Sequence, residues 1–265
     1  MHIIVPIKQV PETSNVKMDP ETGTVMRAGV ETVVNPLDLY AIEAALRMKE
    51  AQGGTVTVLS MGPPQALKAL KEAVAMGCDS AVLVSDRKFG GSDTWATSYT
   101  LAQAIKKIGA FDLIIAGERA TDGDTAQVGP GIASWLKLPL ASYVSKMAYV
   151  NGNRLDVERL VEEGYQRISL PLPALITVVK EIAVPRLPTL RGKKYAKQLE
   201  IPVYSSENME LDATKLGLRG SPTKVVKIAT PKVTRGGKTV LAGDDEAISE
   251  AVEELIAFLD ERGLL

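Results

Sequence analysis

The sequence has few of the residues that support a disulfide scaffold, a zinc site or an acid–base triad. A single cysteine, Cys78, excludes an intramolecular disulfide, and a single histidine, His2, leaves no His/Cys cluster for zinc. With one histidine, a Ser-His-Asp or Cys-His nucleophile is not expected. Chemistry would therefore belong to a bound cofactor, and the cysteine usage predicts a reducing, cytoplasmic location.

The sequence also lacks an excess of either charge and any long apolar run. Lys and Arg number 31 against 32 Asp and Glu, so broad attraction to nucleic acid is not expected. The longest apolar runs, such as LPALITVV, are shorter than the ~20 residues that a membrane helix needs. The N-terminal MHIIVPIKQV has no basic lead-in or small-residue cleavage site, which predicts a first strand rather than a signal peptide.

Short apolar runs alternate with amphipathic segments through the first two-thirds of the chain, as in a parallel sheet covered by helices. Gly77 and Gly109 are expected helix ends, and Ser92 or Asp93 an expected N-cap. We therefore predict an α/β fold with a doubly wound, mostly parallel sheet. Strands are expected at residues 2–7, 55–61, 80–85 and 111–117, and helices at 36–52, 63–77 and 92–109.

The pattern changes after Ser142, where short β-rich pieces predict an antiparallel hairpin or meander at the edge of the sheet. From residue 184 the chain is polar and proline-rich until a strongly helical segment at 244–263. A segment of this length without its own core usually lies against either its own domain or another subunit. We therefore expect a nucleotide-binding domain at 1–183 and a partner-binding arm with a C-terminal helix at 184–265.

The ends of three predicted strands point to a nucleotide site. Pro6 and Lys8 end the first and Met61 and Gly62 the second, while the loop GERATDGDTAQVGP, residues 117–130, follows the fourth. Such strand ends meet at one crevice, where loop N–H groups can hold phosphates. The alternative is a plain turn and helix cap. Likewise, the simplest interpretation of Asn35, before Pro36, is helix capping, and Pro130 leaves the start of the helix after the loop uncertain.

Three separated segments give the chain a resemblance to a known family. VERLVEEGYQRISLPLPALIT, residues 157–177, fits the signature stretch of electron transfer flavoprotein β subunits at every defined position. VNPLDLYAIEAALRMKE, residues 34–50, and ATDGDTAQVGP, residues 120–130, resemble two further segments of that family. The resemblance extends over essentially the whole chain.

The resemblance implies a heterodimer with an α subunit that carries one FAD. Most β subunits of this family hold a structural AMP, whereas flavin-bifurcating ones hold a second FAD. GGSDTWATSYTLA, residues 90–102, and GLRGSPTKV, residues 217–225, resemble the bifurcating group. The small residues of DGDTAQVG would also let a diphosphate pass close to the backbone.

A bifurcating member would take a hydride from NADH at the β-bound FAD. One electron would pass to ferredoxin and the other, through the α-subunit FAD, to an acyl-CoA-type or other flavin dehydrogenase. Two alternatives stay open at this point. One is a non-bifurcating β subunit with AMP, and the other, from a different class, is a nucleotide-binding enzyme or stress-type module on the same fold.

The resemblance also assigns site residues. Those around the adenosine would be Pro6, Asn35, Leu37, Asp38 and Met61. Those at the phosphates would be Gly117, Asp122, Gly123, Asp124, Thr125, Ala126, Gln127 and Val128. Asp93, Thr94 and Thr97 would lie toward the isoalloxazine, although they also suit a helix N-terminus.

PRLPTLRGKKYAK, residues 185–197, resembles the recognition loop that docks acyl-CoA dehydrogenases through a leucine, here Leu190. The segment departs from the pattern of butyryl-CoA dehydrogenase partners, which leaves the dehydrogenase open. The alternative is a solvated basic loop. The basic residues that would accompany Leu190 in docking are Arg186, Arg191, Lys193 and Lys194.

Overall fold

The computed structural model describes residues 1–12, 31–150, 153–226, 239–241 and 243–265. The chain divides into two compact units, Met1–Val226 and Lys227–Leu265. Each unit is described by itself below.

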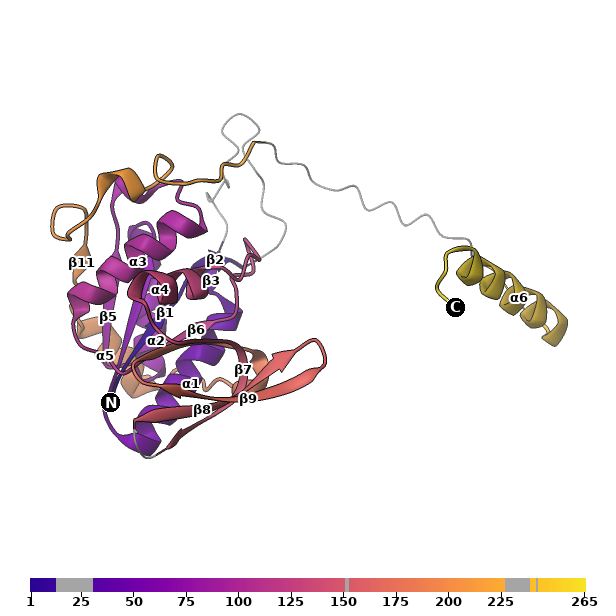
Figure 1. Cartoon of the computed structure of the whole chain (residues 1–265), viewed down its shortest axis with the longest axis horizontal. Coiled ribbons are helices and arrows are strands. Elements are labelled where there is room, and N and C mark those ends of the chain that lie inside the picture. Colours follow the sequence, from indigo (N-terminus) through magenta and orange to yellow (C-terminus); the bar gives the residue numbers. More distant parts are fainter. Residues whose placement is uncertain (13–30, 151–152, 227–238, 242) are drawn as a thin grey trace. The chain divides into compact units, whose positions relative to one another are not determined.

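The first unit is built on a nine-stranded sheet, counted over the described residues (Figure 1). The strand order is β11-β5-β4-β1-β6-β10-β7-β8-β9, with parallel pairing from β11 to β7 and antiparallel pairing in β7-β8-β9. The predicted parallel sheet with an antiparallel edge is therefore confirmed. The strands are β1 (His2–Pro6), β4 (Thr55–Met61), β5 (Ser80–Val84), β6 (Leu113–Gly117), β7 (Leu140–Val150), β8 (Arg154–Val161), β9 (Gly164–Pro171), β10 (Ala174–Val178) and β11 (Val203–Tyr204). A separate antiparallel pair joins β2 (Gln9–Pro11) to β3 (Thr32–Val34).

Helices cover both faces of the parallel strands, because successive strand residues point to opposite faces and both faces are apolar. In β1, Ile3 and Val5 belong to one buried cluster and Ile4 to the other. The first cluster includes α1 (Pro36–Gln52), α2 (Leu67–Met76) and α5 (Leu190–Gln198), and the second includes α3 (Thr94–Ile108) and α4 (Val128–Leu136).

The predicted helix boundaries agree with the structure at most ends. Pro36 is the first residue of α1, and Gly77 and Gly109 follow α2 and α3. Asp93 is the N-cap of α3, where its carboxylate accepts a hydrogen bond from the Ala96 N–H. Pro130 is the third residue of α4, a position whose N–H needs no acceptor within the helix. The uncertainty about the start of α4 is thereby removed.

Of the predicted arm, residues 184–226 lie in the first compact unit. The predicted loop around Leu190 is the helix α5, which buries Ala196. A Cβ at Gly192 would lie 2.1 Å from the carbonyl oxygen of Ala75, so only glycine lets α5 lie this close to α2. β11 then adds to the edge of the sheet beside β5. These contacts could not be predicted from the composition of the segment, because α5 is short and largely polar.

The second unit contains α6 (Asp245–Glu261), which confirms the predicted C-terminal helix. Asp244 caps it by accepting the Ala247 N–H at 2.9 Å. One group of its apolar side chains is about half exposed: Ile248, Val252, Leu255, Ile256 and Phe258. The parts of the predicted arm at 227–238 and 242 lie outside the described residues.

Candidate functional site

A cavity of about 1040 Å³ lies at the carboxyl ends of the parallel strands. The chain places β4 and β5 on one side of β1 and then returns to place β6 on the other, so the strand order reverses between β1 and β6. Parallel α/β sheets bind ligands at such a switch point. Most predicted cofactor-binding residues line this cavity: Pro6, Asp38, Met61, Asp93, Thr94, Thr97, Gly117, Gly123, Asp124, Thr125, Ala126, Gln127 and Val128.

The loop from β6 to α4, predicted to hold phosphates, has the backbone geometry of an anion-binding loop. Asp124 and Ala126 have φ of 53° and 55°, in the left-handed region that favours glycine. Gln127 follows Ala126 with φ −98° and ψ −18°, and it makes no side-chain cap to α4. A left-handed residue followed by a right-handed one turns successive N–H groups toward one point, which binds anions. The uncapped N-terminus of α4 adds further N–H groups and a positive dipole end.

Backbone strain in the loop is a second feature that favours anion binding. Left-handed non-glycine residues cost about 1 kcal/mol or more each and persist where the surroundings fix them. The Asp124 carboxylate also forms an ion pair with Arg119, in which Nε lies 2.7 Å from Oδ1, and the Arg119 and Asp124 side chains are 45% and 71% exposed. Such an exposed pair contributes little to stability, so a phosphate can compete for Arg119.

Asn35 occupies the N-cap position of α1, but its side chain makes no capping hydrogen bond to the helix. Its side chain is fully buried and bonds two residues at the start of the loop between β6 and α4. Nδ2 donates to the Arg119 carbonyl at 2.9 Å, while Oδ1 accepts from the Thr121 N–H at 3.1 Å. Asn35 thus holds the start of the loop in position from the buried side.

Leu37 and Asp122, like Asn35, are predicted site residues that are not among the residues lining the cavity. The Asp122 carboxylate accepts from Lys8 Nζ at 2.6 Å. This ion pair joins the loop to the end of β1. Asn35 and Asp122 therefore support the cavity without forming its wall, and Leu37 follows Pro36 in the first turn of α1.

Asp38 is a buried carboxyl at the adenosine end predicted for the cavity. It accepts the Lys8 backbone N–H at 2.7 Å, and burial raises its pKa from 3.8 to about 7 despite that hydrogen bond. A Cβ at Gly117 would lie 2.3 Å from Asp38 Oδ1, which explains the glycine at the end of β6. Near neutral pH this group can either donate or accept a hydrogen bond.

Asp93 connects two segments that are far apart in the sequence. Its N–H donates to Ser221 Oγ at 2.8 Å, and its Oδ2 accepts from the Thr223 N–H at 3.0 Å and from the Thr223 hydroxyl at 2.7 Å. Burial raises the Asp93 pKa, but hydrogen bonds from Ala96 and Thr223 outweigh it and hold the pKa below its ordinary value. Residues 217–223 are thereby fixed to the N-terminus of α3.

Sequence reasoning missed a part of the wall that follows β5. The polar run after Val84 lies at the end of β5 and lines the cavity. Its position directly after a strand is the same signal that predicts the other segments of the site. The lining residues from this run are Ser85, Asp86, Arg87, Phe89, Gly90, Gly91 and Ser92. Further lining residues that were not predicted individually are Glu118, Arg119, Ala120 and Gly129, which lie in the predicted loop 117–130, Leu101, which lies in the segment 90–102, and Ile132 of α4.

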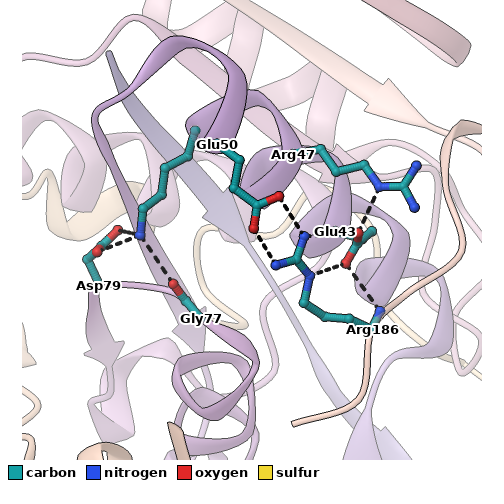
Figure 2. A network of polar contacts seen from close by, with 7 residues as sticks. Glu43, Arg47, Glu50, Gly77, Asp79 and Arg186 are labelled. Carbon is teal, nitrogen blue, oxygen red and sulfur yellow. Dashed lines mark hydrogen bonds and ion pairs between the residues drawn. The ribbon is translucent and has the colours of Figure 1, made fainter. Parts of the chain in front are cut away.

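The predicted docking residues divide into exposed and bound ones. Leu190 begins α5 with 86% of its surface exposed, and Leu187 is 85% exposed. Arg191, Lys193 and Lys194 are also exposed. Arg186 is different, because its guanidinium binds Glu43 and Glu50 of α1 (Figure 2). These ion pairs hold the segment on α1, and the docking role of Arg186 stays a prediction.

The described residues contain neither a candidate membrane span nor a candidate metal cluster. No helix among them is both long enough and apolar enough to span a membrane. No group of three or more His, Cys, Asp or Glu side chains in the same set is arranged to hold a metal ion.

Comparison with known proteins gives one consistent result. Residues 22–207 match the family described as electron transfer flavoprotein domain. Electron transfer flavoprotein subunit beta of Thermoanaerobacterium thermosaccharolyticum is 47% identical, covering 96% of this chain and 98% of its own. The subunit beta of Megasphaera elsdenii is 48% identical, covering 97% and 98%. The caffeyl-CoA reductase-Etf complex subunit CarD of Acetobacterium woodii is 44% identical and covers 100% of both chains.

Proposed function

The chain belongs to the electron transfer flavoprotein family, and we propose that it is a β subunit of the flavin-bifurcating kind. In this proposal it holds FAD in the cavity at the carboxyl ends of the strands and pairs with an α subunit that carries another FAD. NADH is the donor. Ferredoxin and a flavin dehydrogenase are the two acceptors.

The observation that carries the proposal is the extent of the cavity. Ligand pockets usually measure roughly 300–1,000 Å³, and this one reaches the upper end at about 1040 Å³. Its lining brings together three regions: Asp38, the loop residues 123–128, and Asp93, Thr94 and Thr97 around the start of α3. AMP would use the first two regions only, whereas a dinucleotide would use all three.

The loop from β6 to α4 fits a diphosphate on chemical grounds. Its donors are backbone N–H groups around Ala126 and at the N-terminus of α4, and no capping side chain competes for them. Asn35 and the Lys8–Asp122 ion pair hold the loop in position. Asp38 supplies a hydrogen-bonding group at the adenosine end.

One segment that resembles bifurcating members, residues 90–102, lines the cavity, and the other, residues 217–225, is bound to it. Asp93 bonds Ser221 and Thr223, and Leu218 N–H donates to the Gly90 carbonyl at 3.0 Å. Bound FAD would supply the hydride-accepting and one-electron chemistry there. The chain's own residues would bind and orient the ring and limit its contact with water.

The proposal assigns separate surfaces to the partners. The exposed Leu190 and its basic neighbours suit a transient dehydrogenase contact, in which an apolar anchor gives affinity and charges steer the encounter. The half-exposed apolar face of α6 suits the α subunit.

Anaerobic titration of the purified αβ complex with NADH tests the proposal. Each NADH delivers two electrons, so two bound FAD should be fully reduced by about two NADH per heterodimer. An end point at one NADH favours the alternative, a non-bifurcating β subunit that holds AMP. Absence of any α-subunit complex would favour a nucleotide-binding enzyme or stress-type module on the same fold.

A further inference from the structure

A second cavity, of about 480 Å³, lies on the antiparallel extension of the sheet. It shares no lining residue with the nucleotide cavity. Its lining residues are Tyr143 of β7, Arg159, Leu160 and Val161 of β8, and Glu162 of the following turn.

Arg159 occupies an unusual place in β8. Side chains alternate along a strand, so Arg159 lies on the same face as Leu155 and Val157, which are buried in the core. Its Nε is buried and has no hydrogen-bond partner among the described residues. A buried polar group left without a partner destabilises a protein by about 1–3 kcal/mol, and more when it is charged.

Neighbouring acidic side chains do not form an ion pair with Arg159 in the described structure. Glu158 lies on the opposite face of β8 and binds Lys146 Nζ at 2.7 Å and Arg167 Nε at 3.0 Å. Glu162 is exposed and makes no ion pair with Arg159 in the described structure. Arg159 as a whole is partly exposed, and an acceptor from outside the chain would meet the guanidinium from that exposed side.

Tyr143, on the adjoining strand, provides an independent observation. It has φ of 60°, which is strained for an aromatic residue, just before the register shift between Val144 and Lys146. Its N–H donates to the buried Thr177 hydroxyl at 3.1 Å, and the residue remains 38% exposed. Strained residues held in this way concentrate at binding sites.

We propose that this cavity binds a carboxylate side chain of the α subunit, with Arg159 as its ion-pair partner and Tyr143 as a wall. A carboxylate matches the planar donor fork of arginine, and arginine and tyrosine are enriched in the centres of interfaces. A permanent subunit suits a buried donor better than a transient partner does, because Nε then stays satisfied. This inference rests on the proposed pairing with an α subunit.

Substitutions in the intact heterodimer test the inference. R159M removes the charge but keeps an apolar chain, and it should raise the Kd of the heterodimer at least about 30-fold, or about 2 kcal/mol. R167M is the matched control, because Arg167 lies on the same hairpin, is 85% exposed and pairs with Glu158. It should change Kd by less than about fivefold. Sedimentation over a dilution series measures both, and nucleotide content should be unchanged in each.

Carbodiimide cross-linking of an R159K heterodimer identifies the partner. The reagent activates a carboxylate, which the new amine converts to an amide that mass spectrometry can locate. A cross-link from position 159 to an α-subunit Asp or Glu, absent in R167K, supports the inference. A cross-link to Glu162 of the same chain, or one that needs added dehydrogenase, overturns it. An R159M heterodimer of unchanged Kd also overturns it, whereas failure of the unsubstituted chain to bind any α subunit refutes the proposed function itself.

Discussion

Arg186 Nε lies 2.8 Å from Oε2 of Glu43, a carboxylate that is only 3% exposed in α1. The Arg186 backbone N–H also donates to this carboxylate, and its Nη1 binds Glu50 at 2.5 Å (Figure 2). The segment that leads to α5 is therefore fixed on α1 at the point where the docking residues begin. Burial raises the pKa of Glu43, but hydrogen bonds from Arg186 and Arg47 outweigh it and hold the pKa below its ordinary value.

Replacing Arg186 with methionine should lower the free energy of unfolding by roughly 3 kcal/mol, because Glu43 stays buried with Arg47 as its remaining ion-pair partner. Thermal unfolding measures this loss. The depressed Glu43 pKa contributes stability that is present above its unfolded value of 4.5 and lost as pH falls through the folded value. The difference between the two proteins should therefore shrink in acid. Arg191→Met, on exposed α5, is the control, and an equal loss there would contradict the role of Arg186.

Leu190 gives a prediction about docking. Burying one exposed leucine in a partner contributes about 1.5–3 kcal/mol, so Leu190→Ala should slow electron transfer to the dehydrogenase by roughly ten- to a hundredfold at subsaturating partner. NADH oxidation with an artificial acceptor should not change, since Leu190 lies outside the nucleotide cavity. Val203→Ala, on the exposed edge strand, serves as the control. An unchanged rate for Leu190→Ala would mean that the basic segment is only solvated.

Truncation should distinguish the two compact units. A chain ending at residue 226 keeps α5 and β11 and should unfold cooperatively, but it should no longer co-purify with the α subunit. A chain ending at 183 loses both elements together with the Arg186 ion pairs, and it should not reach a stable fold. Circular dichroism on heating, with co-purification, measures these outcomes. Full heterodimer formation by the 226 truncation would show that α6 is not the contact.

Asp38 predicts a particular pH dependence. Its pKa is about 7 in the folded protein and 3.8 in the reference state, so the folded state binds the extra proton between these values. Stability from this group therefore falls as pH rises through that window, by roughly 1.4 kcal/mol per pH unit. Asp38→Asn should gain stability over the unsubstituted protein as pH increases from 4 to 8. Parallel melting curves at both pH values, like those expected for exposed Asp156→Asn, would contradict the burial assigned to Asp38.

The sheet and most of the cavity could be predicted because they follow from local patterns. Apolar runs such as residues 55–61 form strands wherever helices cover both faces, and parallel strand ends meet at one edge. The left-handed residues Asp124 and Ala126 could not be predicted, because neither is the glycine that this conformation favours. Asp124 is held by contacts within the folded loop, which are its N–H bond to the Ala120 carbonyl at 2.8 Å and its ion pair with Arg119.

The structure of the chain around α5 could be predicted less well, for a physical reason. α5 is short and mostly basic, and it exists because it packs on α2 and because Arg186 binds two glutamates of α1. Tertiary contacts of this kind leave no periodic signal in a nine-residue helix. The same holds for Asp93, whose cap was predicted but whose bonds to Ser221 and Thr223 join distant segments.

The nucleotide content of the purified αβ complex tests the central claim most directly. The complex is denatured, and the released nucleotides are separated and quantified against the protein. A cavity filled from the Asp38 end to the Asp93 end predicts about two FAD per heterodimer and no AMP. One FAD and one AMP per heterodimer would contradict the assignment of FAD to this chain.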